Sequence, residues 1–249
     1  MAEQKLAGRT ALVTGGSRGL GAAAARRLAR EGADVAITYV HAKDKAEAVV
    51  DELKGLGVRA AAFQADQGKP DEVIGMVGRV AERFGRIDIL VNNAGVFVTG
   101  PIGALSLDDI TRQWAVNVRG MVAATLEAIK YMPDGGRIVN LGSVNGERSA
   151  AAGLGDYAAT KAAVAAYTRS WAHDLAPRKI TVNTVLPGPS DTDMGIPQES
   201  DLGTFVLGLL PYHRYASPDE VAAVIAFLAG PDASYTTGGE IRVDGGWNA

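Results

Sequence analysis

The amino-acid sequence predicts an α/β fold, a doubly wound sandwich in which helices cover both faces of a seven-stranded parallel sheet. Three observations predict it. Short runs rich in Val, Ile and Thr alternate with longer helical patterns, glycines gather where the first run meets the first helix, and no linker interrupts the alternation. Strands that alternate with helices form parallel sheets, and right-handed crossovers place the helices on both faces.

The predicted strands are short apolar runs bounded by turn-forming residues. Helical patterns follow the first three of them at 20–32, 43–57 and 70–85, and two more stand later at 155–167 and 220–230. In chain order, the seven strands are 10–15, 34–40, 58–66, 87–95, 136–143, 180–188 and 239–246.

We expect the 249 residues to form one domain, 1–249, because no linker divides them. The one departure from the alternation is 189–216, an irregular stretch that mixes acidic and apolar residues. Such a long excursion in a compact α/β domain is usually a functional loop. The stretch therefore predicts a substrate-binding lid at about 189–216.

The composition argues against several classes of function. A formal net charge of -3 argues against a nucleic-acid partner, because proteins of that class usually carry a basic excess. No apolar run is long enough to span a bilayer or to form a signal peptide, so we expect no membrane partner and a cytoplasmic protein. The chain has no cysteine, which excludes thiolate chemistry and disulfides. We expect no metal, because His41, His173 and His213 lack metal-ligand spacing.

A glycine-rich turn follows the first predicted strand. Residues 14–21 read TGGSRGLG, so Gly15, Gly19 and Gly21 stand where the strand turns into a helix. Glycines at that place permit a tight turn, the close approach of a pyrophosphate, and close packing of helix on strand. The turn predicts a nucleotide site; the alternative is a glycine-rich turn that binds no ligand.

Two further motifs accompany this turn, NNAG at 92–95 and a Tyr-x-x-x-Lys pair at 157–161. In this order and spacing the three motifs resemble the short-chain dehydrogenase/reductase family, and the pattern is most similar to its 3-oxoacyl-ACP-reductase-like branch. The resemblance runs from about residue 7 to the C-terminus. It implies a single Rossmann-type domain and an NAD(P)-dependent oxidoreductase that acts on CH–OH and C=O groups.

Tyr157 and Lys161 are four residues apart, so a helix places their side chains on one face. A free tyrosine has a pKa of about 10, and we expect the lysine cation to lower it, which suits a general acid/base. The resemblance implies that Lys161 also binds the nicotinamide ribose and that Ser143 hydrogen-bonds the substrate oxygen. It implies that Asn117 kinks its helix and holds a water in the proton relay. Taken alone, Ser143 is equally a strand-end cap, and Asn117 a buried polar contact.

The end of the second strand indicates which nicotinamide cofactor binds. NAD-binding relatives carry an acidic residue there that meets the adenosine ribose, whereas this chain has Tyr39. By the resemblance, Arg18 supplies a cation for a 2′-phosphate, and His41 and Lys43 add positive potential. NADP(H) is therefore favoured and NAD(H) is possible. In the alternative interpretation Arg18 only solvates the start of its helix.

The resemblance implies further cofactor contacts. Asp66 is expected to bind the adenine amino group, although it is equally a helix-entry residue. Thr192 is expected to bind the nicotinamide carboxamide unless it caps a lid helix, and Asn92 to be largely structural. The other implied contacts are Gly15, Ser17, Gly19, Leu20, Gly21, Gln67, Asn93, Ala94, Gly95, Pro187 and Gly188, together with Tyr157 and Lys161.

The apolar residues of the lid suggest a wall over the substrate, although packing between subunits would explain several of them. They are Met194, Ile196, Leu202, Phe205, Val206, Leu209 and Leu210. The expected substrate contacts are Ser143, Asn145 and Tyr157. Val96 and Leu186 are weaker candidates, placed by family position only.

These features predict an NADPH-dependent reductase that converts a small or medium ketone into a secondary alcohol, with Tyr157 as general acid/base. One alternative is a 3-oxoacyl-ACP or acyl-CoA reductase, for which Arg178 stands in a suitable place. Acyl carrier protein is acidic, so it would need a basic patch, and the acidic Asp134 before the fifth strand argues against this alternative. The lid adds four more acids, Asp191, Asp193, Glu199 and Asp201. A second alternative is an NADPH-binding sensor or scaffold without turnover, against which the intact catalytic set speaks.

Members of the family usually assemble as homotetramers through the tyrosine-bearing helix, a second long helix and the last strand. The alanine-rich surface of 158–172 and the apolar stretch 220–230 suit such packing. By the resemblance we expect a homotetramer.

Overall fold

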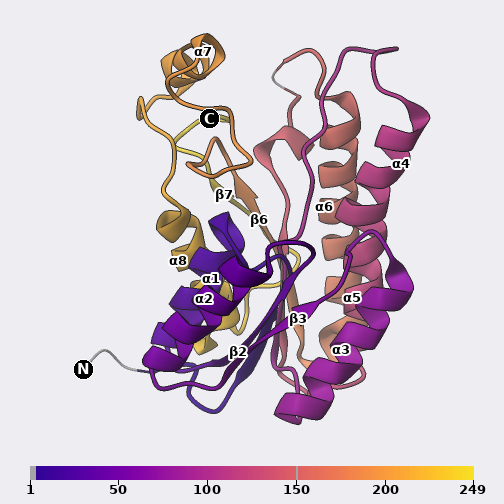
Figure 1. The fold of residues 1–249 in the computed structure, drawn as a ribbon, viewed down its shortest axis with the longest axis vertical. Coiled ribbons are helices and arrows are strands. Elements are labelled where there is room, and N and C mark those ends of the chain that lie inside the picture. Colours follow the sequence, from indigo (N-terminus) through magenta and orange to yellow (C-terminus); the bar gives the residue numbers. More distant parts are fainter. Residues whose placement is uncertain (1–3, 150) are drawn as a thin grey trace.

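The computed structural model describes residues 4–149 and 151–249. Seven parallel strands form one sheet in the order β3-β2-β1-β4-β5-β6-β7, with helices on both faces (Figure 1). The predicted doubly wound fold is confirmed. The strands are β1 (Thr10–Val13), β2 (Asp34–Tyr39), β3 (Ala60–Gln64), β4 (Ile89–Asn92), β5 (Arg137–Leu141), β6 (Thr181–Pro187) and β7 (Glu240–Val243).

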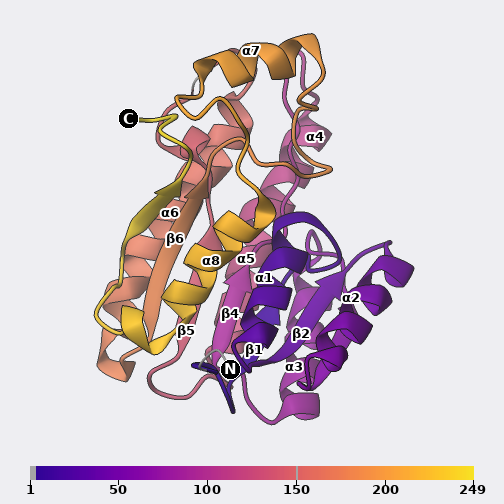
Figure 2. The same ribbon diagram turned by 90° about the vertical axis from the view of Figure 1, so that its left-hand side faces the viewer.

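The helices divide into two layers (Figures 1 and 2). Helices α1, α2 and α8 pack on one face of the sheet, and α3, α5 and α6 pack on the other. Among the described residues, no helix is long and apolar enough to cross a membrane. The helices are α1 (Gly19–Arg30), α2 (Lys43–Gly55), α3 (Pro70–Phe84), α4 (Leu107–Trp114), α5 (Gly120–Ala128), α6 (Gly155–Leu175), α7 (Asp201–Leu209) and α8 (Pro218–Ala229).

Both faces of the central strands are buried. Val13 and Val91 pack with the α1 layer, whereas the neighbouring Leu12 and Leu90 pack with the α3 layer. All four side chains are fully buried. Because successive strand residues point to opposite faces, a strand buried on both faces reads as a continuous apolar run. This burial explains why the central strands were recognisable in the sequence.

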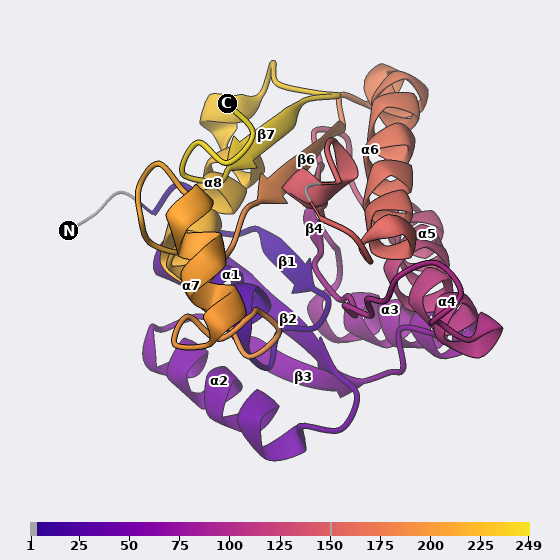
Figure 3. The ribbon, with the colours of Figure 1, turned by 90° about the horizontal axis from the view of Figure 1, so that it is seen from above.

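The strand order reverses between β1 and β4, since the chain first extends from β1 to β3 and then returns to the other side of β1. At such a switch point the connections leave in opposite directions, which opens a crevice at the carboxyl ends of the strands. Seen from above in Figure 3, α7 lies on the α1 side of this edge.

The lid differs in part from the expectation, because 189–216 is not irregular throughout. It contains α7, whose first turn is capped by Ser200: the hydroxyl oxygen accepts a hydrogen bond from the Gly203 backbone N–H at 3.0 Å. The helix packs in a small core of its own, separate from the two cores on the sheet faces. The buried members of that small core are Val206, Leu210 and Tyr215.

A chain of buried polar side chains joins the middle of the sheet to α6. The Asn92 amide donates to Asn140 Oδ1 at 2.8 Å, and the Asn140 amide donates to Thr168 Oγ1 at 2.8 Å. The Thr184 hydroxyl donates to the same oxygen at 2.6 Å, and Thr168 itself donates to the Val164 carbonyl at 2.9 Å. Because a buried polar group without a partner is costly, these bonds fix where α6 lies on the sheet.

We expect Thr168→Val to lower the free energy of unfolding by about 2–4 kcal/mol, because the Asn140 amide and the Thr184 hydroxyl lose their shared acceptor. Thr181→Val is the matched control, since the Thr181 hydroxyl is buried without a hydrogen-bond partner. Its removal should leave stability unchanged or raise it. Urea denaturation measures both changes, and equal losses from the two variants would contradict the role assigned to Thr168.

Candidate active site

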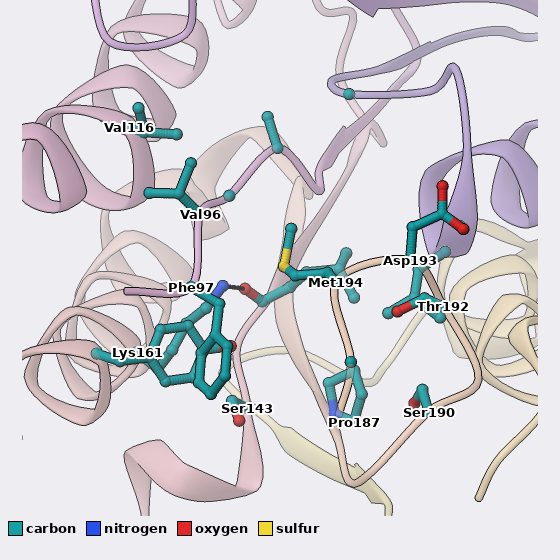
Figure 4. Close-up of a pocket in the computed structure, with 18 of the residues that line it drawn as sticks. Val96, Phe97, Val116, Ser143, Lys161, Pro187, Ser190, Thr192, Asp193 and Met194 are labelled. Carbon is teal, nitrogen blue, oxygen red and sulfur yellow. Dashed lines mark hydrogen bonds between the residues drawn. The ribbon is translucent and has the colours of Figure 1, made fainter. Parts of the chain in front are cut away.

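A cavity of about 1210 Å³ opens at the carboxyl edge of the sheet, beneath α7. It exceeds the roughly 300–1000 Å³ typical of small-molecule pockets, so it has room for a dinucleotide and a second small molecule. Figure 4 shows Phe97, Ser143 and Lys161 at one side, Thr192 and Asp193 at the other, and Met194 between them. All the residues predicted as cofactor contacts line this cavity, apart from Lys43.

The glycine turn forms one wall of the cavity. Gly15 has a φ of +67° and lies close to Ala94. A Cβ added to Gly15 would stand 3.0 Å from the Cα of Ala94. The Gly15 backbone N–H donates to Thr38 Oγ1 at 2.9 Å, which ties the turn to β2. Helix α1 then begins at Gly19, which also has a positive φ. The backbone at the start of α1 thus borders the cavity, an arrangement that suits a phosphate group.

The NNAG segment holds this turn in place. Thr14 Oγ1 accepts hydrogen bonds from the backbone N–H groups of Asn93 (3.0 Å) and Ala94 (3.1 Å). In return the Asn93 amide donates to the carbonyls of Thr14 (2.8 Å) and Gly15 (3.1 Å). Asn93 therefore shapes the turn as well as lining the cavity. The sequence reasoning missed Thr14, although it opens the same glycine motif.

The carboxyl end of β2 and the turn after β3 form the far end of the cavity. Tyr39 is the last residue of β2 and lines the cavity with His41, while Asp66 and Gln67 follow β3. The Asp66 carboxylate accepts a hydrogen bond from the Gly68 backbone N–H at 2.9 Å. It therefore shapes the entry to α3 and borders the cavity at once, so both interpretations of this residue find support.

The cations near this end are arranged differently from the expectation. Arg18 pairs with Asp193 of the lid at 3.3 Å, so it does more than solvate the start of α1. Lys45 approaches the same carboxylate at 3.7 Å. Lys43, which we expected here, lies outside the cavity lining and pairs with Glu47 at 3.6 Å.

Helix α6 and the end of β5 bring the predicted catalytic side chains together. Tyr157, Lys161 and Ser143 all line one part of the cavity. Lys161 Nζ donates to the Leu141 carbonyl at 2.8 Å and lies 5.8 Å from the centre of the Tyr157 ring. The Phe97 ring meets the Tyr157 ring edge to face, with centroids 4.7 Å apart. Phe97 was not singled out in the sequence.

Burial shifts the pKa values of Tyr157 and Lys161 in opposite directions. It raises the pKa of Tyr157 to about 12, and a side-chain hydrogen bond with Ser143 opposes this only in part. It lowers the pKa of Lys161 to about 8, because the buried ammonium has lost its hydration. The pKa of Tyr157 therefore moves opposite to the expectation, because desolvation dominates and Lys161 is not among the groups that lower it.

Asn117 lies beside the cavity rather than in its lining. It belongs to a π-helical turn, Ala115–Arg119, that joins α4 to α5, so its helix is locally distorted as expected. Its amide donates to the Val96 carbonyl (3.0 Å) and to Thr160 Oγ1 (3.1 Å), and its Oδ1 accepts from the Val96 N–H (2.8 Å). The side chain thus clamps the segment that borders Lys161.

Some, but not all, of the residues expected to contact the substrate line the cavity. Asn145 lines the cavity, and its backbone N–H donates to Ser143 Oγ at 3.2 Å, so this serine also caps a short turn. Val96 and most apolar lid residues line the cavity, whereas Leu186 and Leu210 are buried away from it. No helix begins at Thr192, which excludes the alternative of a lid cap. The lining also includes Tyr215 and Trp247, which the sequence reasoning missed.

Arg178, the cation considered for a carrier protein, lies away from the cavity of this chain. It precedes β6, at the amino edge of the sheet, whereas the cavity opens at the carboxyl edge. Its guanidinium pairs with Asp134 at 3.3 Å and donates to the Ile129 carbonyl at 2.9 Å. This cation is therefore engaged within the fold and does not line the cavity.

Comparisons with known proteins agree with the motifs. A family model described as "Enoyl-(Acyl carrier protein) reductase" matches residues 15–248. The chain is 42% identical over 242 residues to the "Cyclic-di-GMP-binding biofilm dispersal mediator protein" of Escherichia coli K12, covering 97% of this chain and 98% of that protein. It is 40% identical over 240 residues to the 3-oxoacyl-[acyl-carrier-protein] reductase FabG of Staphylococcus epidermidis, covering 96% and 98%.

A solved structure is also similar over the whole chain. The short chain dehydrogenase from Burkholderia cenocepacia J2315, in complex with NADP, is 48% identical and superposes with a TM-score of 0.96 over 98% of this chain and 100% of that chain. The matches extend over nearly the whole sequence and the fold is the same. The chain belongs to the short-chain dehydrogenase/reductase family and is an oxidoreductase of that family.

The lowered pKa of Lys161 predicts a pH-dependent stability. The folded pKa of about 8 lies below the ordinary 10.5, so between these values the unfolded chain binds more protons and stability rises with pH. Between pH 7 and pH 10, the wild type should gain on the order of 2 kcal/mol relative to Lys161→Met. Urea denaturation of both proteins at both pH values measures the gain. A difference that stays constant with pH would mean that Lys161 titrates as an exposed lysine.

Proposed function

We propose that this protein is an NADPH-dependent oxidoreductase that reduces a small or medium ketone to a secondary alcohol. The observation that carries the proposal is the position of Tyr157: its half-buried phenol lines a cavity large enough for a dinucleotide, and its pKa is raised to about 12. Ser143 and Lys161 line the same part of the cavity. A protonated tyrosine is the form that a reductase needs, because the ketone oxygen must receive a proton.

The cavity fits a dinucleotide that carries a 2′-phosphate. The glycine turn brings the backbone to the cavity edge, and the end of β2 carries Tyr39 where a carboxylate would disfavour the phosphate. Arg18 and Lys45 supply cations beside it. The Burkholderia structure, a complex with NADP, adds support for NADP(H) as the cofactor.

The residues then divide the proton chemistry between them. The bound cofactor supplies the hydride that the carbonyl carbon accepts. In this proposal Ser143 Oγ hydrogen-bonds the carbonyl oxygen, and the Tyr157 hydroxyl gives that oxygen its proton. Lys161 has the lower pKa of the pair, so its ammonium can return a proton to the phenolate. Asn117 holds Val96, and through it the segment beside Lys161.

We expect Tyr157→Phe to lower kcat for ketone reduction at least about 1000-fold, because the proton donor is lost, while the Kd for NADPH changes little. Tyr167→Phe is the matched control, since this tyrosine lies on the same helix outside the cavity lining and should keep full activity. A panel of ketones with NADPH and with NADH gives both the rates and the cofactor preference. Near-normal turnover by Tyr157→Phe would overturn the proposal.

The side chains around Tyr157 favour an apolar ketone. Phe97 contacts the Tyr157 ring, and Phe205, Leu209 and Trp247 add apolar lining. We expect Phe97→Ala to raise KM for aryl ketones about 3- to 10-fold, the worth of one aromatic contact, with a smaller effect on acetone. Steady-state kinetics measures the change, and NADPH affinity should not move. Equal losses for all ketones would mean that Phe97 only supports Tyr157.

Reduction of 3-oxoacyl thioesters is a second candidate function. The 40% identity to a 3-oxoacyl-[acyl-carrier-protein] reductase favours it. The engagement of Arg178 with Asp134 at the opposite edge of the sheet weighs against a docked carrier. Activity on acetoacetyl thioesters well above that on simple ketones would select this candidate.

An NADPH-binding sensor without turnover is a third candidate. The 42% identity to a protein named as a cyclic-di-GMP-binding mediator favours a regulatory role. The convergence of Tyr157, Lys161 and Ser143 in one cavity favours turnover. Tight NADPH binding with no oxidation across the ketone panel would select the sensor.

We also propose a homotetramer, as in the family. Exposed apolar side chains on three helices of the two layers support it. They are Leu126 on α5, Tyr167 on α6 and Phe227 on α8.

A further inference from the structure

The lid is tied to the cofactor end of the cavity through one carboxylate. Asp193 Oδ2 lies 3.3 Å from Arg18 Nη1 and 3.7 Å from Lys45 Nζ. Arg18 is the N-cap residue of α1, and Lys45 lies in the first turn of α2. Two cations from consecutive helices therefore converge on a residue that is distant in sequence and belongs to the lid.

The same stretch of the lid closes on the glycine turn. The side chain of Thr192 lies about 3.5 Å from where a Cβ on Gly19 would stand. In Figure 4, Thr192 and Asp193 lie across the cavity from Phe97 and Lys161, with Met194 between the two groups. Asp193 itself lines the cavity. Its carboxylate therefore lies beside Arg18, on the glycine-turn side of the cavity.

We propose that Asp193 is a determinant of cofactor choice, because its carboxylate engages the cations that a 2′-phosphate would use. The inference rests on the NADP(H) site proposed above. A 2′-phosphate entering this place must take Arg18 and Lys45 from Asp193, and it meets the carboxylate as a like charge. NADH carries no such phosphate and leaves the carboxylate with its cations. Asp193 thus weakens NADPH binding and leaves NADH binding unchanged.

The same exchange couples the cofactor to the lid. Asp193 stands between Thr192, which borders the glycine turn, and Met194, which reaches into the cavity. A phosphate that displaces the carboxylate releases this stretch of the lid from α1 and α2. The three charged side chains are about 60% exposed (58%, 58% and 62%), so water and salt moderate the effect.

The test compares Asp193→Asn with the wild type for binding of NADPH, NADH and the probe 2′,5′-ADP, followed by fluorescence or calorimetry. The variant should bind NADPH and 2′,5′-ADP roughly 3- to 10-fold more tightly, with NADH changed less than about 2-fold. The gain should shrink at about 0.5 M salt. In an Arg18→Ala background the same substitution should have less effect, because the shared cation is gone.

Asp191→Asn is the matched control. Asp191 is exposed in the same loop, and no ion pair of the described residues includes it. It removes the same charge from the same segment, so a general effect of net charge would appear in both variants.

The inference is overturned by an equal change for NADPH and NADH, by an equal effect of Asp191→Asn, or by weaker NADPH binding by Asp193→Asn. The last would mean that Asp193 orients the cations for the phosphate. If the wild type binds no NADPH, the proposed function fails with it. If the wild type prefers NADPH but Asp193→Asn binds both cofactors as the wild type does, the inference is wrong while the proposed function still stands.

Discussion

The geometry of the cavity depends on how residues 93–96 are held after β4. On one side the Asn93 amide and Thr14 Oγ1 bind this segment to the glycine turn. On the other side Asn117 clamps Val96 with hydrogen bonds to its N–H and its carbonyl. The clamp fixes the distance between the turn that borders the nucleotide end and the helix that bears Tyr157. A shift of this segment would move both ends of the site at once.

Desolvation is the dominant electrostatic effect at the catalytic end. Lys161 is buried and Tyr157 is half-buried at the cavity wall, and the loss of hydration favours the neutral form of each. The phenol therefore holds its proton more firmly while the ammonium holds its proton less firmly. A buried lysine costs stability at neutral pH, so the site trades part of the stability of the fold for a proton that can move.

The sequence sufficed for the fold and for most of the site, because both depend on local pattern. Strands buried on both faces read as apolar runs, and the glycine turn, NNAG and the Tyr157–Lys161 pair are short motifs. Prediction from the sequence failed where a property depends on contacts between residues that are far apart in the chain. The desolvation of Tyr157 depends on the residues packed around it, and Asp193 is 175 residues from Arg18 along the chain. Helix α7 was hidden because Gly203 and Gly208 weaken its helical pattern. The position of Arg178 just before the predicted strand 180–188 already indicated the amino edge of the sheet, but the carrier-protein alternative did not take it into account.

Helix α7 packs in a small core of its own, apart from the two cores that support the sheet. The residues that we propose as catalytic stand on α6 and at the end of β5, which those larger cores support. Mutations that alter α7 can therefore change which molecule is accepted without disturbing the groups that act on it. Such a division makes the lid the part of the chain through which substrate range can drift during evolution, while the reaction itself stays the same.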